Sequence, residues 1–399
     1  MDPQYTPTYH RMWNRDFSLL IVAELLLCIS CYMTFPFMPL HLFKNGYVDA
    51  ASASLTMVFL VAGICVSGFF GCWLIQHYRR NKVFFTSSVC LAAAIFGMSA
   101  FDNPANHRAT QGETLLLMCV CALGGMAFGN AKRVLSCTLL IDKTESSHRT
   151  EANYAAIWIA RLMLVTGLIA ALQLHKEVQG TLFYGIGAAS ALCSAILVMT
   201  VKFPFRAPEE GVRLISIDRF FLPQGWNVAL VILLMSGALG IVMASHLSTE
   251  FLSSLAIGFA IAIAILRYHI VRTGHYTSAV GNVCILASIL AMALHNGLLD
   301  DTLKPMVLGL GFGLTSSEQL YKLLDHCDHC QRSTAESTYF LASDSGLFLG
   351  ISAAWSCGVC QSWLNADSEY TAVWLFAAAT LACSANALKK KHRPEHHAQ

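Results

Sequence analysis

Long apolar runs dominate this chain, and each is long enough to cross a lipid bilayer. A bilayer core takes roughly 20 apolar residues per helix, and charged or Gly-, Pro- and Asn-rich breaks separate about twelve such runs. We predict spans at 17–43, 52–76, 83–101, 114–141, 152–173, 181–203, 227–248, 251–270, 277–298, 304–325, 334–363 and 369–388. Glycine and alanine lie inside the runs, as is typical of closely packed helices in lipid. The sequence therefore predicts an all-α polytopic membrane protein.

The composition excludes several other classes of protein. Only 13% of the 399 residues are charged, whereas soluble domains carry about 25%. The net charge of +2 leaves no electrostatic footprint for nucleic acid. Most of the 15 cysteines are isolated within apolar runs, so we expect no disulfide framework and no cofactor. The cysteines and histidines of 325–330 are too close together to surround zinc easily, and we expect no metal site.

The positions of lysine and arginine predict how the chain is oriented. In a twelve-span arrangement, 19 of the 26 basic residues fall on the side of the termini and 4 on the opposite side, while Lys132, Arg133 and Arg161 lie within spans. Because basic loops stay in the cytoplasm, we expect both termini to be cytoplasmic. Residues 1–16 are polar and lead directly into a full-length span, so we expect no cleaved signal peptide.

The longest connection, 204–226, divides the predicted spans into two groups of six. We expect an N-terminal bundle at 1–203, a cytoplasmic linker at 204–226 and a C-terminal bundle with a cytoplasmic tail at 227–399. Two interpretations of the linker stay open. Its apolar residues among charges could lie in the headgroup plane as a short amphipathic segment, or the linker could be a simple tether.

A weak internal repeat supports this division. An offset of 183 residues pairs Arg149 with Arg332 and also pairs Arg161 with Asp344. The same offset aligns Ala152 with Ala335 and Gly167 with Gly350. Internal repeats are common in transporters, so two pseudo-repeated halves are expected.

Twelve spans, internal termini, a long central loop and a six-plus-six repeat together resemble the major facilitator superfamily. That family has a loop motif between spans two and three, of which Gly71, Arg79 and Arg80 match while Ile75 and Tyr78 replace the acid and the second glycine. The resemblance is to a bacterial branch and implies a monomer in the cytoplasmic (inner) membrane. It also implies conformational roles for the loop residues Gly71, Arg79, Arg80, Arg149 and Arg332.

Ionisable residues inside the spans are the candidate functional residues, since each costs about 2.5–3.5 kcal/mol at mid-bilayer on insertion scales. We expect the candidates to occupy one layer, where acids and bases can pair. They are Glu24, Arg133, Glu318, Arg161 and Asp344. The resemblance implies that spans one, four, seven and ten line a central cavity. Lys132 lies one step around from Arg133, and its long stem favours reaching the headgroups.

Each of these charges has two interpretations. Glu24, Arg133 and Glu318 could handle substrate or ion, or they could be fixed ion pairs that join helices. Arginine keeps its charge at any relevant pH, so Arg133 can hold an anion but cannot carry a proton. A carboxylate in a dry cavity can titrate near neutrality, which makes Glu24 and Glu318 candidate proton carriers. Arg161 and Asp344 fit either interpretation.

The favoured function is secondary active transport of a small solute by alternating access, coupled to protons or another ion. No nucleotide-binding loop is present in the sequence, and we expect no enzymatic activity, because the 15 histidines lie in loops, tails or near span ends rather than beside acids. Two alternatives stay open. They are a non-transporting membrane receptor or regulator and an intramembrane lipid-modifying enzyme.

Overall fold

The computed structural model describes residues 13–102, 109–144, 148–178, 180–203, 213–217, 219–268, 275–293, 301–327 and 331–364. Within these ranges the chain forms helices and no strand. The helices are α1 (Arg15–Thr34), α2 (Phe37–Lys44), α3 (Ala50–His77), α4 (Arg80–Met98), η1 (Ser99–Phe101), α5 (Gln111–Val134), η2 (Leu135–Leu139), α6 (Leu140–Asp142), α7 (Arg149–Glu177), α8 (Thr181–Thr200), η3 (Pro223–Gly225), α9 (Trp226–Ser245), α10 (Thr249–Arg267), α11 (His275–Ala293), α12 (Leu303–Asp325) and α13 (Arg332–Leu364).

The described helices match the predicted spans in order and position, up to the eleventh. Eight of the spans are long and apolar enough by themselves to cross a membrane. The predicted twelfth span, 369–388, lies outside the described residues. The chain is thus an all-α polytopic membrane protein, and the division at 204–226 stays a prediction.

Two spans are interrupted where the sequence or the packing requires it. Span one divides into α1 and α2 around Phe35 and Pro36, because proline cannot continue the hydrogen-bond ladder of a helix. Span four contains a π-helical turn, η2, between α5 and α6. Such turns are rare and often occur at functional sites. This one carries Ser136, which reaches α1 as described below.

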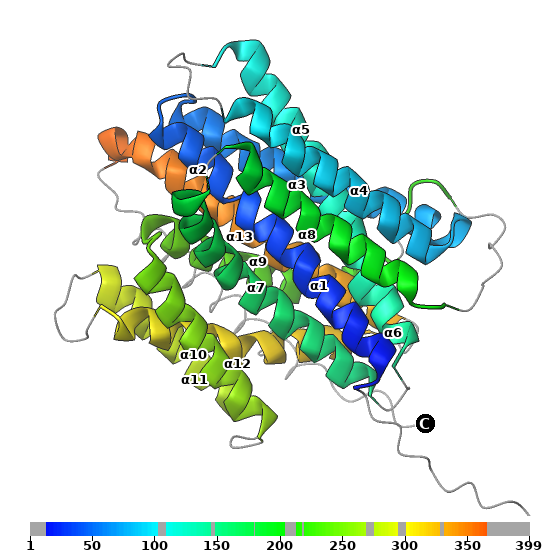
Figure 1. Cartoon of the computed structure of the whole chain (residues 1–399). Helices are drawn as coiled ribbons and strands as arrows, with labels where there is room; N and C mark the ends of the chain where they lie inside the picture. Colours follow the sequence, from blue (N-terminus) through cyan, green and yellow to red (C-terminus); the bar gives the residue numbers. More distant parts are fainter. Residues whose placement is uncertain are drawn as a thin grey trace, which may run out of the picture.

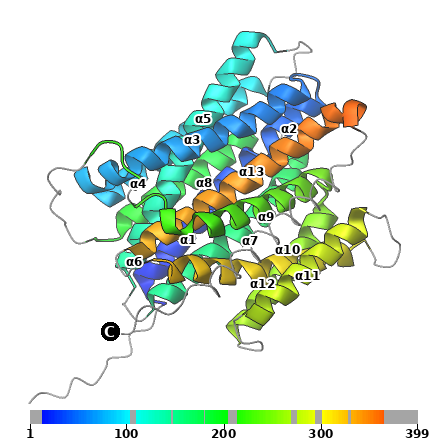
Figure 2. The ribbon, with the colours of Figure 1, turned by 180° about the vertical axis from the view of Figure 1, so that it is seen from behind.

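The two halves pack in the same way. In the first half α3 packs on α5, α4 on α5 and α1 on α7; in the second half α10 packs on α12, α11 on α12 and α9 on α13. The contacts between the halves are also equivalent, since α3 meets α13 and α10 meets α7. Figures 1 and 2 show α13 lying alongside both α3 and α9, with α10, α11 and α12 grouped at one side. This is the arrangement expected of a pseudo-twofold repeat.

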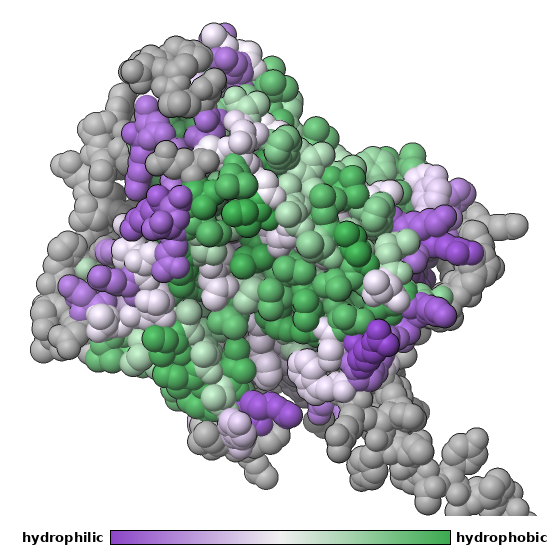
Figure 3. Space-filling view, viewed as in Figure 1, coloured by the Kyte–Doolittle hydropathy of each residue, from purple (hydrophilic) through white to green (hydrophobic). Residues whose placement is uncertain are grey.

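The surface has the pattern of a protein that lies in a bilayer. On the face shown in Figure 3, a belt of hydrophobic side chains separates two hydrophilic ends. Large apolar side chains on several helices point outward within the apolar spans, among them Leu115, Leu123, Ile196 and Ile257, which are 54 to 59% exposed. In water such a surface would be unfavourable. In lipid it requires no partner.

Serine side chains close one end of the seam between the halves. The Ser54 hydroxyl of α3 lies 2.7 Å from the Ser352 hydroxyl and 2.5 Å from the Ser356 hydroxyl, both on α13. The Ser352 hydroxyl also donates to the Ser54 carbonyl at 3.0 Å. We call this group of three residues the serine clasp. It joins the first half to the second at the end of the bundle where α3 begins.

The linker closes the other end of the seam. The Phe220 ring packs directly over Gly68 of α3, where even a Cβ atom would collide with it. The backbone N–H of Leu222 donates to the Thr338 hydroxyl of α13 at 2.8 Å. The linker therefore contacts both halves, so the tether interpretation is wrong for this part of it.

The preceding part of the linker remains compatible with the headgroup interpretation. Leu214, Ile215 and Ile217 are all more than half exposed. These three residues lie just before Phe220, which is buried against α3. The apolar residues of the linker are therefore exposed in its earlier part and buried in its later part.

Candidate functional site

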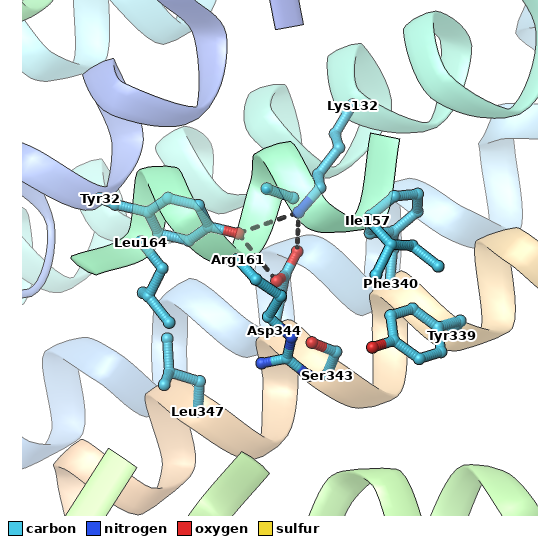
Figure 4. Close-up of a pocket in the computed structure, with 11 residues that line it drawn as sticks. Tyr32, Lys132, Ile157, Arg161, Leu164, Tyr339, Phe340, Ser343, Asp344 and Leu347 are labelled. Atoms are coloured by element: carbon cyan, nitrogen blue, oxygen red, sulfur yellow. Dashed lines mark hydrogen bonds and ion pairs between the residues drawn. The ribbon is translucent and has the colours of Figure 1, made fainter. Parts of the chain in front are cut away.

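A buried ion pair joins the halves at the centre of the seam. The Lys132 ammonium of α5 donates to Asp344 Oδ2 of α13 at 2.7 Å and to the Tyr32 hydroxyl of α1 at 2.9 Å. Tyr32 in turn donates to Asp344 Oδ1 at 2.9 Å. Figure 4 shows the three polar groups converging from three helices. Each group has its charge or hydrogen-bonding capacity matched by the other two, which is what buried charges require.

Lys132 does not reach the headgroups, so that expectation is wrong. Its side chain is 2% exposed and its ammonium lies 4.5 Å from the centre of the Phe340 ring. Ring faces attract cations, and the Asp344 carboxylate supplies the opposite charge. The long stem that permits snorkelling on an isolated helix here reaches across the seam instead.

A small cavity beside this pair lies on the repeat axis. The ion-pair cavity has a volume of about 10 Å³, which is room for one water molecule. Its lining includes four pairs of positions that the repeat offset of 183 relates. These pairs are Ile157 with Phe340, Ala160 with Ser343, Arg161 with Asp344, and Leu164 with Leu347. Equivalent positions of α7 and α13 therefore face each other across this cavity.

Arg161 lines the same cavity but pairs with no acid in the described structure. Its side chain is 9% exposed, and one guanidinium nitrogen donates to the Ser236 hydroxyl of α9 at 3.1 Å. Among the described residues, the Arg161 Nε has no hydrogen-bond partner, and neither does the hydroxyl of nearby Tyr339. Asp344 thus pairs across the seam with Lys132, and Arg161 is left with unused donors.

Arg133 connects α5 to α3 and the linker. Its guanidinium donates to the carbonyl and to the hydroxyl of Ser67, both at 3.0 Å, and lies 4.9 Å from the Phe220 ring centre. A Cβ at Gly71 would collide with this guanidinium, so a larger residue there would displace the end of the Arg133 side chain. Span four also packs closely against α3 before Arg133, since Gly125 lies against the Leu60 carbonyl of α3.

Glu24 and Glu336 are two buried carboxylates that form no ion pair in the part of the chain that the structure describes. Both Glu24 oxygens lie within hydrogen-bond distance of the Ser136 hydroxyl, at 2.7 and 2.8 Å. Glu336 of α13 is fully buried, and neither of its oxygens has a partner among those residues. The two carboxylates are near enough to interact electrostatically. Sequence reasoning missed Glu336, although it lies two helical turns before Asp344.

Glu318 does not join the central cluster. Its carboxylate lies 3.3 Å from the Lys322 ammonium one turn away on α12, and it lines none of the cavities described here. Glu318 thus pairs within its own helix, and its place in the predicted layer stays a prediction. With Glu336 in place of Glu318, the buried cluster still contains three acids and three bases, because Lys132, Arg133 and Arg161 are all present.

Two further cavities adjoin the ion-pair cavity through different residues. The Arg133 cavity, about 20 Å³, shares Lys132, Phe340 and Asp344 with it. The apolar cavity, also about 20 Å³, shares Arg161 and Leu164 with it. The remaining lining of the apolar cavity comprises Val165, Leu239, Leu255, Phe259, Gly309 and Phe312. Three small cavities thus form a row between the halves, polar at one end and apolar at the other.

No group of three or more potential metal ligands occurs among the described residues. Residues 328–330 of the histidine- and cysteine-containing stretch at 325–330 lie outside them.

Comparison with known proteins identifies the architecture. No family profile and no curated protein matches the sequence. Among solved structures, an auto-inhibited POT family peptide transporter superimposes with a TM-score of 0.65 at 11% identity, over 97% of this chain and 99% of the other. An outward-facing bacterial homologue of the iron transporter ferroportin gives 0.65 at 16%, over 95% and 100%. A mutant of the nucleoside transporter NupG gives 0.61 at 14%, over 94% and 99%.

The chain has the major facilitator fold. The resemblance inferred from the sequence is thereby confirmed at the level of fold.

Within the major facilitator fold, the cavity lining differs from the expected one. The ion-pair cavity is lined by spans one, four, five and eleven rather than by one, four, seven and ten. Spans five and eleven both line this cavity, through the repeat-related positions of α7 and α13. Of Glu24, Arg133 and Glu318, only Arg133 lines one of the three cavities.

Of the loop residues given conformational roles above, Arg80 joins two helix ends. Arg80 pairs with Asp142 at 2.5 Å and so joins α4 to α6. In the motif of the family an acid stands at the position of Ile75. Here the acid that pairs with Arg80 is Asp142, at the end of span four. Arg79 occupies the N-cap position of α4 without a side-chain capping bond, and Arg149 and Arg332 begin the repeat-related helices α7 and α13. Roles for these residues in conformational change stay a prediction.

Proposed function

We propose that this protein is a secondary transporter that moves a small solute by alternating access of its two halves, with proton coupling. One observation carries the proposal: the Lys132–Asp344 ion pair lies buried between the halves, beside a row of small cavities. Charges inside a membrane protein are costly and mark ion or substrate pathways. The major facilitator fold of the three superimposed transporters supports the same proposal.

The contacts at the two ends of the seam suit a closed intermediate of such a cycle. The serine clasp joins α3 to α13 at one end, and Phe220 and Leu222 connect the same helices at the other. These contacts are a few hydrogen bonds and one ring contact, which can separate without unfolding a helix. A transporter requires that these closures open in turn. A purely structural protein has no such requirement.

The remaining parts of the proposal follow the charge distribution and the fold. We place the chain as a monomer in the inner membrane of a bacterium, with the linker end in the cytoplasm. A non-transporting receptor would have no need of a charged seam, and a lipid-modifying enzyme would need histidines and acids together at reacting depth. No observation in the described structure favours either alternative.

Cross-linking the serine clasp tests alternating access. In the Ser54→Cys/Ser352→Cys variant, oxidation should hold the clasp closed and shift the population toward states open at the linker end. Hydrogen–deuterium exchange on the reconstituted protein should then slow near Ser54 and speed up near Phe220 and Thr338. The two single variants are the controls, and reduction should restore the original exchange. Unchanged exchange at the linker end after complete cross-linking would disprove alternation.

Glu24→Gln tests proton coupling. If Glu24 carries the proton, opening of the seam in the unmodified protein should change with pH, since a neutral and a charged carboxyl favour different states. The amide mimics the protonated acid, so in the variant the opening should be independent of pH. Exchange near Ser54 and Phe220, measured across neutral pH, reports this. Glu318→Gln, which alters an acid already paired with Lys322, is the matched control. Equal pH dependence in both variants would sink the assignment.

A further inference from the structure

Arg161 has the properties of a binding residue rather than of a structural one. A buried guanidinium is normally paired with a carboxylate or has its donors satisfied, since unpaired buried charge is expensive. The Arg161 guanidinium donates to Ser236 and lies close to the Tyr339 hydroxyl, and its Nε has no partner in the described structure. The nearest acid lining its cavity, Asp344, is already held by Lys132 and Tyr32. Within the described residues, the guanidinium therefore lacks an anionic partner.

Other unused donors face the same cavity. The Tyr339 hydroxyl is buried without a hydrogen-bond partner among the described residues, and the Arg161 guanidinium lies 5.9 Å from the Tyr339 ring centre. In Figure 4 the hydroxyls of Tyr339 and Ser343 lie on the side of the cavity where the Arg161 side chain ends. A guanidinium beside a phenol and a serine hydroxyl presents several donors to one small volume. A carboxylate, with two oxygens and four lone pairs, is the group that such a set matches.

The other side of Arg161 is apolar. The guanidinium lines both the ion-pair cavity and the apolar cavity. Leu239, Leu255 and Phe259 are among the residues that line the apolar cavity. Apolar lining of this kind favours a hydrocarbon group through the hydrophobic effect. A ligand held by its carboxylate at Arg161 would therefore extend a short hydrocarbon tail toward Phe259 and Phe312.

We propose that Arg161, Tyr339 and Ser343 bind the carboxylate of a small organic acid whose apolar tail occupies the adjoining cavity. The inference rests on the proposed transport function and names its substrate class as amphipathic monocarboxylates. The cavities of about 10 and 20 Å³ are too small for such a molecule in this closed arrangement, so it enters when the halves separate. Asp344 does not repel it, because Lys132 neutralises that carboxylate.

A ligand series of matched shape tests the class. The melting temperature of the purified full-length protein is measured with hexanoate and benzoate, with the uncharged hexanol and with the cationic hexylamine. Both carboxylates should raise it, whereas the alcohol and the amine should not. Acetate, which lacks the tail, should bind more weakly than hexanoate. A shift with hexylamine and none with hexanoate, or no shift with any carboxylate, would overturn the proposal.

Substitutions then assign the binding to this place. Arg161→Gln should weaken hexanoate binding by about 10- to 100-fold, which corresponds to the loss of a charged hydrogen-bonding group. Arg161→Lys keeps the charge without the planar fork, so its affinity for hexanoate should lie between that of the unmodified protein and that of Arg161→Gln. The exposed Arg15, changed to Gln, is the matched control and should bind as the unmodified protein does. Equal affinity in Arg161→Gln and Arg15→Gln would refute the assignment.

The tail cavity offers a second test, in a variant that keeps the arginine. Phe259→Ala enlarges the apolar cavity and should shift the preference from hexanoate toward octanoate. This result remains informative if Arg161→Gln does not fold, and an unchanged chain-length preference would contradict the proposed tail position. If the two ends of the seam open alternately but no carboxylate binds, only the proposed substrate class is refuted. Binding to a seam that does not alternate would instead refute transport.

Discussion

Replacing Asp344 by Asn should be among the most damaging single changes in the described structure. The substitution removes the one carboxylate that the buried Lys132 ammonium contacts among the described residues, and the Tyr32 hydroxyl, the surrounding rings and the new amide oxygen carry no compensating charge. Removing one member of a buried pair costs about 3–5 kcal/mol, because the remaining charge is uncompensated. We expect a large fall in melting temperature, low yield of folded protein and loss of transport.

A charge-neutral double variant separates stability from function. In Lys132→Met/Asp344→Leu no charge of the pair is left uncompensated, and apolar replacements of buried pairs are often neutral or stabilising. The double variant should therefore regain most of the melting temperature that Asp344→Asn loses, yet remain unable to transport. Recovery of transport together with stability would show that the pair only joins the halves. A double variant as unstable as the single one would mean that the pair itself stabilises the fold.

Replacing Glu336 by Met should have the opposite effect on stability. Both oxygens of Glu336 are buried without a partner in the described structure, and an unsatisfied buried polar group costs about 1–3 kcal/mol, or more when it is charged. A methionine of similar length fills the space without that cost, so the melting temperature should rise. We expect function to be impaired, since groups that destabilise a fold are often retained for activity.

The same change at Glu318 provides the comparison. Glu318→Met removes a carboxylate that pairs with Lys322, so it should leave the melting temperature unchanged or lower it. Thermal unfolding of both variants in the same detergent measures the difference. A lower melting temperature for Glu336→Met than for Glu318→Met would show that Glu336 is satisfied by a group outside the described residues.

Much of the fold could be predicted because the bilayer imposes it. Spans must be apolar and about 20 residues long, so hydropathy alone places eleven of them close to the described helices. Pro36 predicts the break between α1 and α2 for an equally local reason. The 183-residue repeat, visible in a few identities, relates positions that turn out to face each other across one cavity.

The charge partners were less predictable, because they depend on which helix lies opposite. Lys132 could reach the headgroups or the seam with the same stem, and only the position of α13 decides between them. Glu318 pairs with a residue on its own helix, which depth alone does not indicate. Glu336 lies in the polar segment that opens α13, where hydropathy marks it as a loop neighbour. The signal available in the sequence was its spacing, because Glu336 precedes Asp344 by eight residues and so lies on the same face of a helix.

The repeat-related pairs around the ion-pair cavity also determine how the chain can assemble. Arg161 of one half corresponds to Asp344 of the other, and the lining is otherwise apolar or neutral at the related positions. A dimer of two N-terminal halves would bring arginine to the position opposite arginine, and two C-terminal halves would oppose two aspartates. Like charges in a low-dielectric seam repel strongly. Each half is therefore complementary to the other and unsuited to itself, so co-expressed separate halves should pair as heterodimers.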